Sequence, residues 1–254
     1  MQPETLVLLI ALANIWSHLL GAAQFLFGLG QFLQLQSLAW SDSIQTSDIA
    51  AVSLYYLCVA ACFGVSSYYH AFSDHSPEIH KFGNQLDHLG IVLVIWGTGV
   101  SGTHFAFYCN REIELLHLTA MTLVGVGCAF FTLQPKFRQP TYRTARFLLY
   151  SFLGASLFAP VVHGMIKFGP KDLAEMMDLK SFLGLAIINF SGAAIYAARV
   201  PERWFPGTFD LIGQSHNLMH VLVFLGAIIR LNGLHAVVDR WQQHTAQHGY
   251  CGGN

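Results

Sequence analysis

The sequence predicts an all-α integral membrane protein, a bundle of seven transmembrane helices. Hydrophobic residues make up 54% of the 254-residue chain and charged residues only 11%, against about 45–50% and about 25% in soluble domains. The apolar residues also fall into seven long stretches. A chain this poor in charge cannot cover a water-facing surface, and its net charge of −1 predicts no nucleic-acid partner.

Each apolar stretch is long enough to cross the hydrocarbon core as a helix, which takes about 20 residues. The stretches cover residues 6–34, 49–71, 87–108, 112–133, 145–165, 180–198 and 211–234. The first begins close to Met1, but MQPE contains no Lys or Arg and the stretch exceeds the apolar region of a signal peptide. We therefore interpret it as a span, with no soluble domain before it.

Six polar or punctuated segments separate the later spans from the first and from one another. They are QLQSLAWSDSIQTSD, SDHSPEIHKFGNQ, NREIE, QPKFRQPTYRT, KFGPKDLAEMMD and RVPERWFPGTF. Their Pro, Gly and charged residues are typical of loops, and no alternation typical of strands is sustained. We predict a single seven-transmembrane domain over residues 1–254.

Lys and Arg residues in the loops predict the orientation of the bundle, because cytoplasmic loops carry more of them. The N-terminus shares one side with the loops between spans 2 and 3, 4 and 5, and 6 and 7. That side holds seven Lys and Arg residues, and the opposite side holds five. This small excess predicts a cytoplasmic N-terminus and a C-terminus on the outer side.

Three histidines and one aspartate interrupt apolar stretches on the same side of the predicted bundle. His70 ends the second span, Asp87 begins the third, and His216 and His220 lie in the first turns of the seventh. Counting the spans places all four at a similar depth, on the side predicted to be cytoplasmic. Ionisable residues within membrane spans are expensive to bury and are therefore functional candidates.

The segment SHNLMH places His216 and His220 four residues apart, on one face of a helix. Two imidazoles one turn apart can bind one metal ion. With His70 they supply three neutral imidazoles and leave one open position, as in a catalytic zinc site. Ser66 lies four residues before His70 and faces the same way. The sequence thus predicts a zinc site near the cytoplasmic side.

The other histidines have simpler interpretations, since a single intramembrane histidine usually hydrogen-bonds a carbonyl or a neighbouring side chain. An H-x3-H pair alone is also a weak metal signal. We interpret His18 as a supporting or structural group in the first span. The rest flank loops, lie toward the opposite side or belong to the polar tail: His75, His80, His88, His104, His117, His163, His235, His244 and His248.

Four segments together resemble the progestin and adipoQ receptor family, which is related to haemolysin III proteins. They are NIWSHLLG in the first span, SSYYHAFSDHS ending the second, LDHLGI opening the third and VPERWFPGTFDLIGQSHNLMHVL before the seventh. The resemblance covers nearly the whole chain. It is greatest to the adiponectin-receptor-like branch, including its fungal members.

The resemblance implies seven helices, a cytoplasmic N-terminus and zinc held by His70, His216 and His220. It implies that Asp87 and Ser66 lie in the same pocket. Family members are linked to ceramidase-type hydrolysis of lipid amides, to lipid signalling and, in fungi, to zinc and sterol homeostasis. In such a hydrolase Asp87 would be the general base, and Ser66 would hydrogen-bond the water or the developing oxyanion.

Two departures from the family pattern matter. The family carries Asn-Glu-Thr before Asn-Ile-Trp, whereas ALA precedes NIWSH here, which predicts a shortened or altered amino-terminal region. We therefore do not extend to this protein any partner binding that family members make through their amino-terminal region. His88 stands where the family often has Tyr, and it would add a titrating group beside Asp87.

A second function fits the same residues. The zinc would be structural, and the protein would be a receptor or scaffold that binds a cytosolic or extracellular protein. Asp87 and Ser66 favour chemistry, because a closed structural site would use a fourth protein ligand. Under both functions the expected partners include membrane lipids. For the hydrolase, ceramide is the example of a lipid substrate. The expected location is the plasma membrane, the Golgi or the endoplasmic reticulum.

Cys109 and Cys251 both fall on the predicted outer side. They would pair if that side is oxidising, and two free thiols are the other interpretation. The remaining cysteines, Cys58, Cys62 and Cys128, are interpreted as small buried apolar residues.

Overall fold

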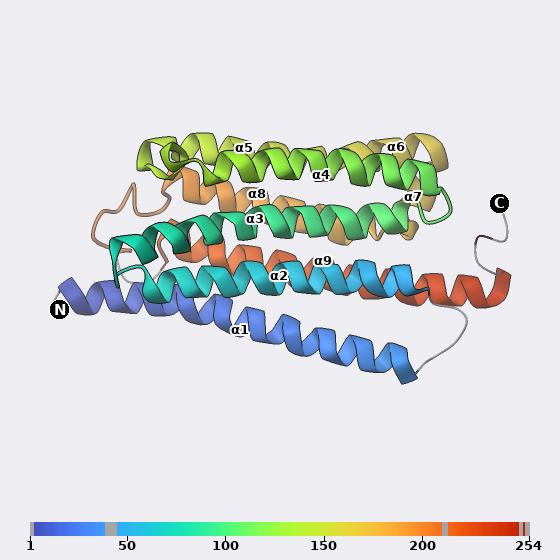
Figure 1. The fold of residues 1–254 in the computed structure, drawn as a ribbon, viewed down its shortest axis with the longest axis horizontal. Helices are drawn as coiled ribbons and strands as arrows, with labels where there is room; N and C mark the ends of the chain where they lie inside the picture. The colour runs from blue at the N-terminus through green and yellow to red at the C-terminus, as the bar shows by residue number, and fades with distance from the viewer. Residues whose placement is uncertain (1–2, 39–44, 210–212, 249–250, 252–254) are drawn as a thin grey trace.

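The computed structural model describes residues 3–38, 45–209, 213–248 and 251, and among these residues all regular structure is helical. Figure 1 shows the long helices side by side, with the start of α1 and the end of α9 at opposite ends of the bundle. The helices are α1 (Pro3–Leu38), α2 (Thr46–Phe72), α3 (Pro77–Ala106), α4 (Arg111–Leu133), α5 (Arg143–Ser156), α6 (Phe158–Phe168), α7 (Pro170–Met176), α8 (Leu179–Ala198) and α9 (Ser215–His248), with 3-10 turns at Pro135–Arg138 and Pro140–Tyr142.

Within the described residues, six helical segments are long and apolar enough to cross a membrane. They are Thr46–Phe72, Pro77–Ala106, Arg111–Leu133, Arg143–Phe168, Leu179–Ala198 and Ser215–Gln247. The first predicted span, residues 6–34, lies within α1, and its crossing of the membrane stays a prediction. Residues 211 and 212, which begin the seventh predicted span, lie outside the described residues.

The fifth predicted span, residues 145–165, is interrupted. Helix α5 ends at Ser156 and α6 begins at Phe158. The cause is Pro160, because proline donates no backbone hydrogen bond and its ring clashes with the carbonyl four residues earlier, which here belongs to Ser156.

Several helices extend beyond the apolar stretches. Helix α3 begins at Pro77, ten residues before the predicted span, because the Ser76 side chain caps the backbone N–H of Ile79 and proline suits a first turn. The segment predicted as the loop between spans 5 and 6 contains α7. The polar tail after residue 234 continues α9 as far as His248.

Helices α2 and α3 pack closely because glycines of α3 face cysteines of α2. A Cβ atom on Gly97 would lie 2.8 Å from Cys58 Sγ, and one on Gly90 would lie 2.9 Å from Cys62 Cα. Small residues at such contacts let membrane helices approach. This close packing brings the end of α2 and the start of α3, which carry His70 and Asp87, next to each other.

The structure joins Cys109, just after α3, to Cys251, beyond α9, in a disulfide bond. Of the two interpretations of these cysteines, it therefore favours pairing. The bond lies at the end of the bundle opposite His70, because α3 runs from one end to the other. The cysteines predicted to be buried, Cys58, Cys62 and Cys128, are free and buried.

The disulfide predicts a labelling pattern. After denaturation without reduction, a maleimide reagent should label three of the five cysteines, and after reduction it should label all five. The matched variant Cys109→Ser/Cys251→Ser should take three labels under both conditions. Five labels on unreduced wild-type protein, counted by intact mass spectrometry, would show that the two thiols are free.

Candidate metal centre

The three histidines predicted as metal ligands come from two helices that are distant in sequence. His70 lies in the last turn of α2, and His216 and His220 lie in the first two turns of α9. These two helix ends lie at the same end of the bundle (Figure 1). The structure therefore brings together the three residues that span counting placed at one depth.

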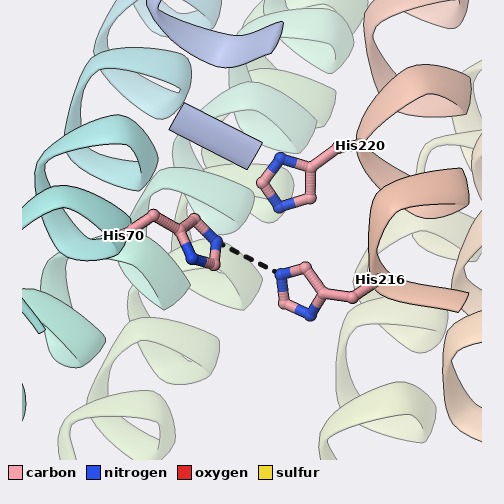
Figure 2. Close-up of side chains that lie close together, drawn as sticks. All are labelled: His70, His216 and His220. Atoms are coloured by element: carbon pink, nitrogen blue, oxygen red, sulfur yellow. Dashed lines mark hydrogen bonds between the residues drawn. The ribbon is translucent and has the colours of Figure 1, made fainter. Parts of the chain in front are cut away.

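The imidazole rings of these histidines face a common centre (Figure 2). One ligand nitrogen from each lies within 4.8 Å of the others, and the Nε2 atoms of His70 and His216 are 3.2 Å apart. Two nitrogens on one tetrahedral zinc ion, each at about 2.0–2.1 Å from it, lie about 3.3 Å apart. The buried Nδ1 atom of His220 has no hydrogen-bond partner among the described residues. The donor set thus fits a zinc ion.

His18 of α1 supports this cluster through the face of its ring. Its imidazole stacks on His220, with 3.8 Å between ring centres, and on Phe63, with 4.5 Å. Neither of its ring nitrogens has a hydrogen-bond partner in the described part of the chain. His18 therefore restrains the plane of the His220 ring by stacking.

A cavity of about 250 Å³ opens beside this cluster and is lined by two of its histidines, His216 and His220. Ser66, Asp87, His216 and His220 line its polar end. Deeper in the bundle its wall is mostly apolar and includes Val94, Leu157, Phe158, Phe182, Leu185 and Phe190. An apolar cavity with a few polar groups at one end suits a ligand that has a long hydrocarbon chain and a polar head.

Asp87 of α3 and Ser66 of α2 both line this polar end. Ser66 is 2% exposed, so its hydroxyl is held within the bundle. His88 also lines the cavity, but its Nδ1 atom donates to the Asn84 carbonyl at 2.8 Å. That ring nitrogen is therefore occupied by the helix backbone.

A family model described as haemolysin-III related matches residues 11–231. The chain belongs to this family. The adiponectin receptor protein of Drosophila melanogaster is 32% identical over 221 residues, which are 87% of this chain and 49% of that protein. The progestin and adipoQ receptor-like protein 1 of Caenorhabditis elegans is 31% identical over 87% of this chain and 50% of its own length.

A fungal relative is also similar. The ADIPOR-like receptor IZH2 of Saccharomyces cerevisiae is 30% identical over 87% of this chain and 69% of its own length. The chain spans about half the length of the animal relatives. The resemblance predicted from the four sequence segments is confirmed, and this member of the haemolysin-III-related family is an integral, multi-pass membrane protein.

Sequence analysis missed the part that two basic residues play in the cavity, because it counted Arg143 and Arg146 only as loop charges. Both line the cavity. The Arg143 guanidinium lies 4.4 Å from the ring centre of Tyr196, and that ring lies edge-on to His216 at 5.2 Å. Arg146 donates from Nη1 to the Gln139 carbonyl at 3.0 Å. The positive charge of Arg143 is therefore held close to His216, one of the candidate metal ligands.

Glu202, in the loop between α8 and α9, was also missed. Its carboxylate accepts the Ser215 backbone N–H at 2.9 Å and also the Ser215 hydroxyl. Burial alone would raise the pKa of Glu202, but these hydrogen bonds outweigh it and hold the pKa below its ordinary value. Ser215 directly precedes His216, so Glu202 fixes the first turn of the helix that carries two of the histidines.

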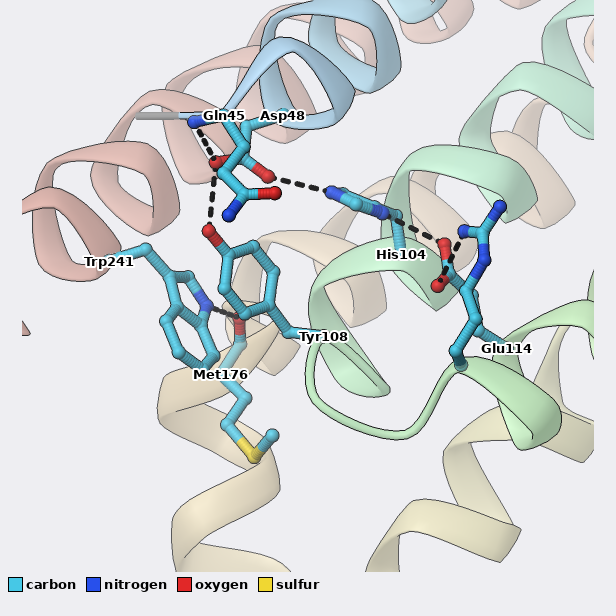
Figure 3. A network of polar contacts seen from close by, with 8 residues as sticks. Gln45, Asp48, His104, Tyr108, Glu114, Met176 and Trp241 are labelled. Atoms are coloured by element: carbon cyan, nitrogen blue, oxygen red, sulfur yellow. Dashed lines mark hydrogen bonds and ion pairs between the residues drawn. The ribbon is translucent and has the colours of Figure 1, made fainter. Parts of the chain in front are cut away.

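His104 lies in the last turn of α3, at the other end of that helix from Asp87. Its environment is different (Figure 3). Its Nε2 atom lies 2.8 Å from Asp48 Oδ1, and its Nδ1 atom lies 2.8 Å from Glu114 Oε1. Tyr108 donates to the other Asp48 oxygen at 2.9 Å. Since both ring nitrogens face carboxylates, the imidazole carries both protons and links α2, α3 and α4. We call His104, Asp48 and Glu114 the buried charge cluster.

Proposed function

We propose that this protein is a zinc-containing, seven-transmembrane, adiponectin-receptor-like hydrolase of lipid amides, with ceramide as the model substrate. The observation that supports this best is the cluster of three imidazoles beside Asp87 and Ser66, at the polar end of an apolar cavity. A structural cluster would have no need of a carboxylate and an apolar cavity beside it.

In this proposal His70, His216 and His220 hold the zinc ion. Bound zinc lowers the pKa of water to about 7 and polarises a carbonyl oxygen. Asp87 takes the proton of the attacking water and returns it to the amide nitrogen, as the new C–O bond forms and the C–N bond breaks. Ser66 hydrogen-bonds the water or the developing oxyanion, and the apolar wall holds the acyl chain.

We also propose that α1 crosses the membrane, which gives seven spans in all, and that the N-terminus is cytoplasmic. The excess of Lys and Arg on that side supports this orientation. The Cys109–Cys251 disulfide lies at the opposite end, and disulfides persist in oxidising compartments rather than in the cytosol. The metal centre would then lie near the cytoplasmic side of the membrane.

A receptor or scaffold with a structural zinc ion is the second candidate function. It is favoured by the relatives from D. melanogaster and S. cerevisiae, which are named as receptors. The cluster would then join α2 to α9, and cytosolic or extracellular proteins would bind the loops. A fungal-type role in zinc or sterol homeostasis belongs to the same class of non-catalytic functions.

Release of fatty acid from ceramide by purified protein in lipid nanodiscs separates these candidates. We expect turnover by the wild-type protein and by His75→Ala, which alters an exposed histidine at the same end. We expect none from His216→Ala/His220→Ala. Turnover that persists in the double variant would place the chemistry elsewhere. A zinc-loaded wild-type protein without turnover would favour the receptor or scaffold.

A further inference from the structure

The loop between α8 and α9 exposes two large aromatic residues side by side in the sequence. Trp204 is 67% exposed and Phe205 is 54% exposed. Arg199 and Arg203 are exposed in the same loop. Nothing in the described part of the chain covers these side chains. The loop lies at the ends of two membrane-spanning helices, at the end of the bundle that holds the metal centre.

Backbone hydrogen bonds hold this loop in a defined shape. Arg203 N donates to Arg199 O at 2.8 Å, and Trp204 N donates to Pro201 O at 2.9 Å. Thr208 N donates to Phe205 O at 3.2 Å. The aromatic side chains are thus presented outward by a turn that is fixed from within. A loop selected only to connect two helices would have no need to display them.

The charge of the loop points to an anionic surface. Between residues 199 and 209 the only carboxylate is Glu202, with Asp210 following directly in the sequence, and the Glu202 carboxylate is turned toward Ser215. Within residues 199–209 the outward charge therefore comes from Arg199 and Arg203. Tryptophan favours the boundary between lipid and water, and basic residues next to a membrane span attract anionic headgroups.

We propose that residues 199–209 form a docking surface for anionic lipid headgroups of the surrounding bilayer. Trp204 and Phe205 enter the boundary between headgroups and hydrocarbon, and the two guanidinium groups bind lipid phosphates. The same bound loop steadies Glu202, which holds Ser215 and hence the position of His216. Only this last consequence rests on the proposed metal site.

Lipid binding can be measured by native mass spectrometry of the detergent-solubilised protein with phosphatidylserine or phosphatidylcholine added. We expect the wild-type protein to prefer phosphatidylserine. Each basic residue near an anionic surface contributes about a fivefold factor, so Arg199→Gln/Arg203→Gln should weaken binding by about 25-fold. The matched control Lys171→Gln/Lys180→Gln removes two exposed charges at the opposite end and should leave it unchanged. An equal loss of phosphatidylserine binding in the arginine and lysine double variants would overturn the proposal.

Fluorescence quenching tests the aromatic contact independently. Lipids brominated near the headgroup should quench a fraction of the emission of the five tryptophans, and Trp204→Phe should remove part of that fraction. Acrylamide in the aqueous phase should quench little of the Trp204 contribution. Strong quenching by acrylamide and none by brominated lipid would contradict membrane docking and would favour a soluble protein as the partner.

The link to the metal centre has its own readout. In nanodiscs, zinc affinity measured by chelator competition should be higher with phosphatidylserine than without it, and Glu202→Gln should abolish the difference. Lipid binding without any effect on zinc affinity would overturn the link alone. Lipid binding by a protein that holds no zinc would contradict the proposed metal site and leave the docking surface standing.

Discussion

Replacing Asp87 by Asn is expected to lower ceramide turnover by at least about 100-fold, because general acid–base catalysis contributes about 10²–10⁴-fold. Asparagine keeps the shape of the side chain and can still accept a hydrogen bond through its amide oxygen. It cannot take a proton from water at neutral pH. Zinc content should be unchanged, since Asp87 is not one of the three clustered ligands.

The control for this experiment is Asp74→Asn, which alters an exposed carboxylate in the turn between α2 and α3. It should keep both turnover and zinc. Steady-state kinetics in nanodiscs and metal analysis on the same samples give both readouts. Turnover of Asp87→Asn at the wild-type rate would mean that another group accepts the proton. Loss of zinc from Asp87→Asn would mean that the carboxylate helps to hold the metal.

Removing His104 is expected to destabilise the bundle strongly. His104 is 6% exposed and lies between two carboxylates that are 2% and 3% exposed, Asp48 and Glu114. Removing one partner from a buried ion pair costs about 3–5 kcal/mol, because the opposite charge stays buried without compensation. His104→Ala should therefore lower the melting temperature in detergent well below that of the wild type.

Arg111 provides the matched control for the buried charge cluster. Its side chain is 66% exposed, although it pairs with Glu114 at 3.0 Å, and exposed ion pairs are worth about 0–1 kcal/mol. Arg111→Ala should therefore have a small effect. Adding Asp48→Asn and Glu114→Gln to His104→Ala should recover part of the stability, since it removes the uncompensated charges. Equal melting temperatures for Arg111→Ala and His104→Ala would refute this account.

The sequence was enough to predict the convergence of His70, His216 and His220. The i,i+4 spacing put two of them on one helix face, and counting the spans put the third at the same depth. It could not predict the distances between the rings, because these depend on how α2, α3 and α9 pack. From the sequence alone, Gly90 and Gly97 do not indicate that α2 and α3 pack closely at these positions.

The helix boundaries show a second limit. Apolar stretches mark the part of a helix suited to lipid, whereas caps and prolines decide where the helix begins and ends. Ser76 extends α3 beyond its apolar stretch, and Pro160 interrupts the fifth. Both residues are visible in the sequence, but an analysis of hydrophobic stretches alone does not take helix caps and prolines into account.

The buried charge cluster could not be predicted, because its members lie on three helices. Asp48 is 56 residues from His104, and both it and Glu114 lie in the first turn of a helix, where acidic residues are common for local reasons. Only the fold brings them to one imidazole. The role of Glu202 could not be predicted either, because its hydrogen bonds with Ser215 form only when the loop after α8 folds back to the start of α9.

The most direct test of the central claim is the metal content of the purified wild-type protein, beside His216→Ala/His220→Ala. Both are prepared without chelators from cells supplied with zinc and are analysed by mass spectrometry of the elements. The three clustered imidazoles predict about one zinc ion per wild-type chain, lost in the double variant. A wild-type protein without zinc, or a double variant that retains it, would contradict the claim.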